Sequence, residues 1–486
     1  MGVERPIRNQ LDPENWDEFR GFLTQMVGDV VDHLRDLRDV PVWTPPTASM
    51  RAALGEAAPQ TGQGPQETYR QFKEYILPHI AGNIHPKFWG WVVGSGAPAS
   101  MVGDWLGAFV NGVPTLFDDS SLQTELQVID WIKQVLGFEK TASGVLTTGV
   151  SEATVIALMV ARHKAFGDKI KQSGLLGLNQ KPVFYISDQT HDCSRKAIEI
   201  LGFGRDHVRV VETDSQYRMR TDRLAETITA DLRAGCKPVA VIATVGTVNT
   251  GAFDDVREIA AICRKHNIWL HIDGAFGIWT SIADARKHLC DGAALADSVV
   301  FDMHKWMYQI YDMGCVLIRE AGLHKRALQV ETDYLAHIDG TLTDAPEELS
   351  SYAIQLSRGF KALKFWFALK SEGFDAFARA IEQNIQLADY LTEQIQKSEA
   401  LELLAPTTLH IVNFRFIGDI RNPALLDQCN IALLKRLHRG GIALPSSTVL
   451  DGNFSIRVCI SNHRTERRDI DDFLGAVNAI GGELAN

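Results

Sequence analysis

The chain has 486 residues, 45% hydrophobic and 22% charged, a composition typical of a globular protein with enough apolar side chains for a buried core. Disorder, collagen and a disulfide-dense miniprotein are excluded as descriptions of the whole chain. The excess of 60 acidic over 49 basic residues gives a formal net charge of −11, which disfavours nucleic acids and anionic membranes as partners.

The seven cysteines are scattered and include no C-x-x-C pair, so we expect free thiols in a reducing compartment. Residues 1–16 are interrupted by charges and lack the apolar core of a signal peptide, and Pro6 breaks the myristoylation pattern after Gly2. No apolar stretch approaches the ~20 residues that cross a membrane. A cytoplasmic protein with no membrane partner is expected.

An amphipathic helix is predicted over 12–34. Asp12 is a suitable capping residue, and Pro13 suits the first helical position. Apolar side chains then recur at steps of three and four residues, at Phe19, Phe22, Leu23, Met26, Val27, Val30 and Leu34. This stripe packs either on its own subunit or on a second one. Prolines and glycines between 41 and 65 indicate a linker-like stretch.

Short apolar runs alternate with helical patterns from about residue 144 to 318. Strands are predicted at 145–148, 183–187, 208–212, 239–245, 269–273, 298–302 and 315–318, with helices between them that include 152–166 and 256–266. This alternation is typical of βαβ units around a buried, mostly parallel sheet. Ligands of such sheets bind beyond the carboxyl ends of the strands.

The pattern changes after Arg358. A long helix is predicted from 360 to about 397, followed by alternating apolar residues over 412–416 and 454–458 and by an amphipathic helix at the end of the sequence. These elements predict a smaller α+β domain with an antiparallel sheet.

Polar side chains follow four of the predicted strands. Residues 147–153 lead into a helix, where backbone N–H groups and Ser151 form either an anion site or a plain helix cap. His191 is either a catalytic residue or a hydrogen-bonded turn residue. Asp273 either caps a helix or is a buried carboxylate that needs a cationic or hydrogen-bonding partner. Lys305 either extends to solvent or lies in a low dielectric that leaves its amine partly deprotonated and nucleophilic.

Together these residues form the set that pyridoxal 5′-phosphate (PLP) requires. Lys305 would form the Schiff base, and Asp273 would keep the pyridinium nitrogen protonated so that the ring acts as an electron sink. His191 would stack on one ring face, and Ala275 would leave room beneath the other. The phosphate would be held by Ser151 and His304.

Eight stretches of the sequence resemble, in order, those of a known enzyme family. They are HPKFWGWV (85–92), TTGVSEATVIAL (147–158), SDQTHDCSRKA (187–197), ATVGTVNTGAFDD (243–255), HIDGAFG (271–277), DMHKWMY (302–308), LSRGFKALKFWF (356–367) and ALPSSTVLDGNFSIRVCISNHRT (443–465). The chain resembles the group II, fold-type I PLP-dependent amino-acid decarboxylases, the family of the aromatic-L-amino-acid, histidine, glutamate and cysteine-sulfinate decarboxylases. The resemblance covers most of the chain from residue 70 onward.

This resemblance implies an α/β fold of the PLP-dependent transferase type, with helices on both faces of the central sheet. It implies an N-terminal segment (1–100) that packs across a dimer, a large PLP-binding domain (101–365) and a small C-terminal α+β domain (366–486). It also implies an obligate homodimer with active sites at the interface. The site residues it implies are Lys305, Asp273, His191, Ser151, Ala275 and His304, with Val150 and Thr247 at backbone-binding positions.

Two departures from the family pattern bear on catalysis. The family usually has Asn-Pro before the His-Lys pair, whereas this chain has Asp302-Met303, and an extra carboxylate near the phosphate is unfavourable unless Asp302 turns away to a local donor. Residues 339–346 resemble the mobile catalytic loop, but no tyrosine stands clearly at the position of the family's proton donor. Tyr352 of the neighbouring subunit or His191 is the remaining candidate donor.

Substrate choice rests on few residues. Trp89, with Phe88 and Trp91, either lines an aromatic-accepting mouth or belongs to a core or dimer interface. Arg457 either binds the substrate carboxylate through two hydrogen bonds or forms a structural salt bridge. No metal ligands are assigned.

The expected function is decarboxylation of an L-amino acid to the amine and CO2. Decarboxylation-dependent oxidative deamination to an aldehyde, or aminotransfer, is the alternative on the same scaffold, because a carbanion without a positioned acid reacts with oxygen or is protonated on the cofactor. A PLP-binding protein without turnover is the alternative from another class.

Overall fold

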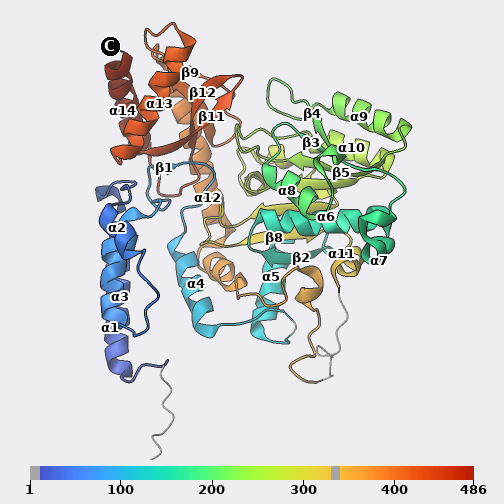
Figure 1. Ribbon diagram of the computed structural model, residues 1–486, viewed down its shortest axis with the longest axis horizontal. Helices are drawn as coiled ribbons and strands as arrows, with labels where there is room; N and C mark the ends of the chain where they lie inside the picture. Colours follow the sequence, from blue (N-terminus) through green and yellow to red (C-terminus); the bar gives the residue numbers. More distant parts are fainter. Residues whose placement is uncertain (1–10, 116, 330–339, 486) are drawn as a thin grey trace, which may run out of the picture.

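The computed structural model describes residues 11–115, 117–329 and 340–485. Two sheets organise the chain (Figure 1). The large sheet has the strand order β2-β8-β7-β6-β5-β3-β4 and is parallel except for β8, which is antiparallel to both neighbours. Its strands are β2 (Ser143–Thr147), β3 (Pro182–Ser187), β4 (Val208–Val211), β5 (Lys237–Thr244), β6 (Trp269–Asp273), β7 (Ser298–Asp302) and β8 (Gly314–Ile318). The predicted mostly parallel sheet is confirmed.

Helices cover both faces of the large sheet because its strands are apolar on both sides. In β3, Phe184 and Ile186 join a buried cluster with α6 and α8, whereas Val183 and Tyr185 join a second cluster with α9, α10 and α12. The helices of this part of the chain are α5 (Ser120–Val135), α6 (Val150–Phe166), α7 (Lys169–Ser173), α8 (Asp192–Ile200), α9 (Thr221–Arg233), α10 (Val256–His266) and α11 (Ala321–Leu328). This layering leaves the carboxyl ends of the parallel strands as the edge where loops meet.

The small sheet has the order β1-β11-β12-β10-β9. Its antiparallel strands are β9 (Leu401–Leu403), β10 (Ile411–Phe416), β11 (Leu444–Leu450) and β12 (Asn453–Cys459), and β1 (Phe88–Trp89) pairs in parallel with β11. Helices α13 (Pro423–Arg439) and α14 (Arg467–Ala485) pack on it around a core that includes Phe414, Ile456 and Phe473. The predicted smaller antiparallel α+β unit is confirmed.

Helix α12 (Ala362–Lys397) connects the two cores. Its first turns bury Phe365 in the core of the large sheet, and its last turns bury Leu391 in the core of the small sheet. Gly373 breaks the helix with a φ of 71°, a left-handed conformation that costs glycine little.

The N-terminal helices α1 (Trp16–Arg35), α2 (Ala48–Ala53) and α3 (Pro65–Gln71) lie along one side of the molecule (Figure 1). Helix α1 is amphipathic as predicted, but none of its residues is buried. Its cap is Asn15, whose side chain accepts the N–H groups of Asp17 and Glu18, and the predicted cap Asp12 lies before the helix.

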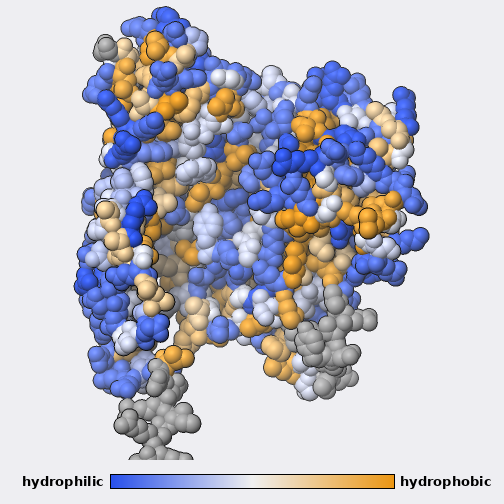
Figure 2. Space-filling view, in the orientation of Figure 1, coloured by the Kyte–Doolittle hydropathy of each residue, from blue (hydrophilic) through white to orange (hydrophobic). Residues whose placement is uncertain are grey.

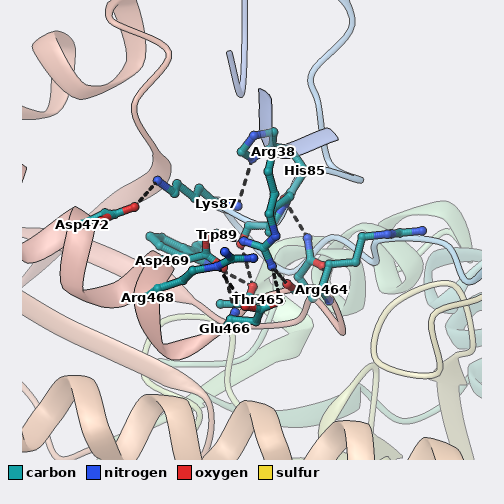
Figure 3. Close-up of polar contacts among 12 residues, drawn as sticks. Arg38, His85, Lys87, Trp89, Arg464, Thr465, Glu466, Arg468, Asp469 and Asp472 are labelled. Atoms are coloured by element: carbon teal, nitrogen blue, oxygen red, sulfur yellow. Dashed lines mark hydrogen bonds and ion pairs between the residues drawn. The ribbon is translucent and has the colours of Figure 1, made fainter. Parts of the chain in front are cut away.

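The segment after α1 is bound to the small C-terminal unit (Figure 3). Arg38 donates to the buried carboxylate of Asp469 at 2.5 Å, to Glu466 at 2.9 Å and to the carbonyl of Arg464. Lys87 pairs with Asp472 at 2.8 Å. The segment after α1 is therefore fixed to the C-terminal unit of the same chain.

A groove of about 440 Å³ separates α1 and α3 from helix α4 (Pro98–Val110). Its apolar lining includes Val30, Leu34, Phe72 and Met101, and Figure 2 shows apolar side chains in the hollow beside these helices. Within the described ranges, no helix combines the length and apolar character that a membrane crossing requires.

Candidate active site

A cavity of about 500 Å³ opens at the carboxyl ends of the parallel strands. Segments that follow β2, β3, β5, β6 and β7 form its walls, although they lie far apart in the sequence. The predicted site residues that line it are Lys305, Asp273, His191, Ala275, Ser151, Val150 and His304. The structure thus brings together the amine, the acid, the imidazole and the helix start in one cavity.

Asp273 and Lys305 reach the cavity from neighbouring strands. Asp273 ends β6 and pairs in register with Val300 of β7, and Lys305 follows the end of β7. The Asp273 side chain is buried and accepts the N–H of Ala275 at 3.1 Å. Burial raises the pKa of Asp273, and the charges of Lys305 and His191 offset part of that rise. This carboxylate therefore lies where a cationic partner stabilises it.

The position of Asp302 bears on two questions that the sequence leaves open. Asp302 does not turn away from the site: its Oδ2 lies 2.8 Å from Lys305 Nζ, and its Oδ1 accepts the N–H of Val150 at 2.8 Å. Burial alone lowers the pKa of Lys305, but the charges of Asp302 and Asp273 outweigh burial and the net pKa is raised. In this arrangement Lys305 is an ammonium group rather than the partly deprotonated amine that a low dielectric alone predicts.

His191 caps helix α8. It lies directly before the helix, and its Nδ1 accepts the N–H of Cys193 at 3.1 Å. Because Nδ1 is an acceptor, the neutral ring carries its proton on Nε2. His191 can therefore be both a hydrogen-bonded turn residue and a catalytic residue, because Nδ1 is bound in the turn and Nε2 is left for the cavity.

The start of helix α6 is closely packed against the start of β8. The residue before the helix is Gly149, which offers no capping side chain. A Cβ at Gly314 of β8 would come within 2.5 Å of the Gly149 Cα, so glycine is required there for this approach. His304 lies beside the helix start, and its Nδ1 accepts the N–H of Met313 at 3.0 Å.

These residues fit PLP at most of its groups. An amine, a buried acid and an imidazole face one cavity, and a helix N-terminus with Ser151 in its first turn offers N–H groups of the kind that bind phosphate. The exception is Asp302, whose carboxylate already accepts one of those N–H groups.

Thr247 and Arg457 hold the walls of the cavity rather than line it. The Thr247 hydroxyl accepts the N–H of Ala252 at 3.0 Å within its own loop. Arg457 is buried and donates to the carbonyls of Trp91 at 2.9 Å, Asn249 at 3.2 Å and Val248. These acceptors are backbone carbonyls rather than carboxylates, so the contacts of Arg457 are not a salt bridge. Arg457 joins the loop after β5 to the segment after β1.

The aromatic stretch near residue 90 places one ring at the cavity. Trp91 lines it, with 58% of the residue exposed. Trp89, the predicted substrate residue, is instead fully buried in the core of the small sheet, where its Nε1 donates to Thr465 at 3.1 Å. Strand β1 alternates sides, so Trp89 and Phe88 are buried in different cores, whereas the ring of Trp91, beyond the strand, lies 6.5 Å from that of Phe88.

Tyr352 lies in the core of its own subunit and outside the cavity lining. Its hydroxyl donates to Glu347 at 2.5 Å, and its ring packs on His324 with centroids 4.9 Å apart. Of the segment that resembles the mobile loop, residue 339 lies outside the described residues. The structure does not bring Tyr352 to the cavity of this subunit.

Sequence reasoning missed Tyr311. Its ring packs on His304 with centroids 4.2 Å apart, lines the cavity and is 45% exposed. Tyr308, three positions earlier, is buried and donates its hydroxyl to Asn384 at 2.7 Å. No periodic pattern in this irregular segment separates the two tyrosines.

The chain is similar to several known proteins. The pyridoxal-dependent decarboxylase conserved domain matches residues 46–417. An aromatic-L-amino-acid decarboxylase of Bacillus atrophaeus is 32% identical over 473 residues, which cover 96% of each chain. Crystal structures of Oryza sativa TDC with PLP and tryptamine (24% identity, TM-score 0.90) and of Rhodiola rosea 4-hydroxyphenylacetaldehyde synthase (23%, 0.88) each cover 98% of this chain and 100% of their own. At these identities the two structures show the fold.

Proposed function

The chain belongs to the pyridoxal-dependent decarboxylase family and is a PLP-dependent amino-acid decarboxylase, and we propose that its substrate is an aromatic L-amino acid. The observation that carries this proposal is the pair of exposed rings, Trp91 and Tyr311, in the cavity that also holds Lys305. Aromatic rings contribute binding energy to another ring beyond the area they bury. The name of the Bacillus atrophaeus relative supports the same substrate class.

The chain's own residues would divide the chemistry as follows. When bound, PLP supplies the electron sink that accepts the electron pair left by departing CO2. Lys305 would hold the cofactor through its amine in the absence of substrate. Asp273 would hold a proton on the ring nitrogen, because a buried carboxylate at that position is stabilised by an adjacent positive charge. Ala275 leaves space beside the ring.

His191 is proposed as the donor of the proton that replaces CO2 at Cα. Its Nδ1 is held by the N–H of Cys193, which leaves the proton on Nε2. The alternative donor, Tyr352 of the neighbouring subunit, has its hydroxyl bound to Glu347. At the phosphate end, Ser151 and the backbone of Val150 lie at the α6 start beside His304.

We also propose a homodimer. The apolar stripe of α1 has no buried residue, a groove lies beside it, and Phe109 of α4 is 80% exposed. A second copy of this chain would cover these surfaces. Sedimentation is expected to give twice the 53.9 kDa of one chain, and a monomer at working concentration would contradict the proposal.

The division into 1–100, 101–365 and 366–486 stays our proposal for the domains. The separate cores of the two sheets support a boundary within α12, and the exposed α1 supports a segment that packs on a partner. A cytoplasmic location is proposed because all seven cysteines are free thiols.

A product assay tests the proposed function. The enzyme is incubated with aromatic, acidic and basic L-amino acids, with and without oxygen, and amine, CO2, aldehyde, keto acid and peroxide are measured. Aromatic amine and CO2 in equal amounts, without peroxide, are expected. Aldehyde together with peroxide would favour oxidative deamination. Keto acid without CO2 would favour aminotransfer, and no response to any amino acid would favour a binding protein without turnover.

A variant tests the substrate class separately. Trp91→Leu is expected to raise the KM for an aromatic substrate by about 2- to 10-fold, as the loss of one aromatic contact predicts. The KM for a small aliphatic amino acid, if it is accepted, serves as the control and should change less. An equal change for both would mean that Trp91 does not select aromatic substrates.

A further inference from the structure

Asp302 lies between the helix start proposed to bind the cofactor's phosphate and the amine that would bond its aldehyde. Its Oδ1 is bound to the first N–H of helix α6, and its Oδ2 lies 2.8 Å from the Lys305 amine. His304 Nε2 is 3.6 Å from the same Oδ2. The carboxylate is buried, so its charge is balanced by these neighbours rather than by water.

The phosphate proposed for this helix end would meet that carboxylate. A phosphate monoester carries a charge of about −1.5 to −2 near neutral pH. It would compete with Asp302 for the Val150 N–H, in a site where water screens little. Two anions that share buried donors repel each other, and one of them keeps a proton. A protonated Asp302 can instead donate a hydrogen bond to a phosphate oxygen and leave the Val150 N–H to the phosphate.

We propose that Asp302 makes the binding of pyridoxal phosphate proton-linked, because its carboxylate takes up one proton from solvent when the phosphate group enters the start of helix α6. The inference rests on the proposed phosphate site at Val150 and Ser151. It gives a role to the residue by which this chain departs from the Asn-Pro-His-Lys pattern. An asparagine at this position has no charge to neutralise, so the linkage is a property of the aspartate.

Other charged and titratable groups surround Asp302, and each could contribute to a pH dependence. They come from the segment after β7, from β6 and from α8, and they are Lys305, His304, Tyr311, Asp273 and Cys193. The cofactor phosphate itself also titrates, with a pKa of about 6. The test must therefore compare a variant with the wild type rather than interpret one pH profile.

The first experiment measures PLP affinity against pH. Full-length protein, freed of cofactor by dialysis against hydroxylamine, is titrated with PLP between about pH 6.5 and about pH 8.5. As the pH rises, the wild-type affinity for PLP is expected to fall more steeply than that of Asp302→Asn. The difference is up to about tenfold per pH unit, which is the value for one linked proton. Asp312→Asn is the matched control: it removes an acid from the same segment, paired with Lys361 and outside the cavity lining, and should keep the wild-type slope.

A second measurement counts the protons directly. Calorimetry in two buffers of different ionisation enthalpy gives the protons taken up by the wild type and by Asp302→Asn on binding PLP and on binding pyridoxal, which has no phosphate. In the wild type about one more proton per site is expected with PLP than with pyridoxal, and this excess should be absent in Asp302→Asn. Equal uptake, or equal slopes for wild type and Asp302→Asn, would overturn the inference. If PLP did not bind through Lys305 at all, the proposed function itself would fail, and the two failures are therefore distinguishable.

Discussion

Asp273 at the end of β6 and Lys305 just after β7 line one cavity from neighbouring parallel strands, held in register by the pairing of Asp273 with Val300. Strands β6 and β7 are buried along their whole length, so the positions of both groups are set by the core of the sheet rather than by a surface loop. A rigid separation between acid and amine is what a single aromatic cofactor held at both ends requires.

Replacement of Asp273 by asparagine is expected to slow turnover while PLP stays bound through Lys305. The amide cannot stabilise a proton on the ring nitrogen as a carboxylate does, and a hydrogen bond to a charged group is worth about 1.5–3 kcal/mol, so kcat should fall roughly 10- to 150-fold. The measurement is kcat at saturating PLP, with the visible absorbance as a check on occupancy. A variant with unchanged kcat would remove Asp273 from the mechanism.

Two substitutions at His191 separate its capping role from its role in the cavity. Asparagine can cap α8 as the His191 Nδ1 does, so His191→Asn should unfold at nearly the wild-type denaturant concentration but lose turnover. His191→Ala should lose turnover and also about 1 kcal/mol of stability. Full activity in His191→Asn would show that the residue is a cap alone.

The buried ion pair of Glu125 and Arg358 is expected to stabilise the region between α5 and β2. Arg358 Nη1 lies 2.8 Å and Nη2 2.5 Å from Glu125, and both side chains are almost fully buried. Glu125→Gln should therefore lower the free energy of unfolding by about 3–5 kcal/mol, because a buried guanidinium is left without its counter-ion. Denaturant unfolding at fixed chain concentration measures this loss. The double variant Glu125→Gln with Arg358→Met should lose less free energy of unfolding than the sum of the losses of the two single variants.

His85 is expected to contribute to destabilisation in acid. Its Nδ1 accepts the N–H of Lys87 at 3.0 Å (Figure 3), and burial lowers its pKa from 6.5 to about 4. The unfolded chain takes up a proton near pH 6.5 and the folded chain only near pH 4, so acidification between these values favours unfolding. His85→Asn keeps an acceptor for Lys87 without titrating, and its melting temperature should fall less with pH than that of the wild type. If the melting temperatures of the wild type and His85→Asn fell equally with pH, a contribution from His85 would be excluded.

The large sheet and the candidate site residues could be predicted because the sequence signals for them are local. β6 and β7 coincide with the predicted runs 269–273 and 298–302, and the strand-end rule then places Asp273, Lys305 and His191 at one edge. Buried apolar runs and the residues that end them lie within a few positions of one another, so no distant contact is needed to identify them.

The sequence left open, or predicted wrongly, residues whose environment is set by distant parts of the chain. The orientation of Asp302 depends on the Val150 N–H, which belongs to another element. The burial of Trp89 follows from the pairing of β1 with β11, a contact between opposite ends of the sequence. Capping by Asn15 rather than Asp12 is a smaller error, since both residue types cap helices and only the geometry selects one.

Identification of the lysine that carries the cofactor tests the account most directly. Borohydride reduction of the PLP-loaded enzyme, followed by proteolysis and mass spectrometry, is expected to find the reduced cofactor on Lys305. Lys305→Ala should correspondingly lose both its visible absorbance and its turnover. A label on a different lysine, or a coloured and active Lys305→Ala variant, would contradict the central claim.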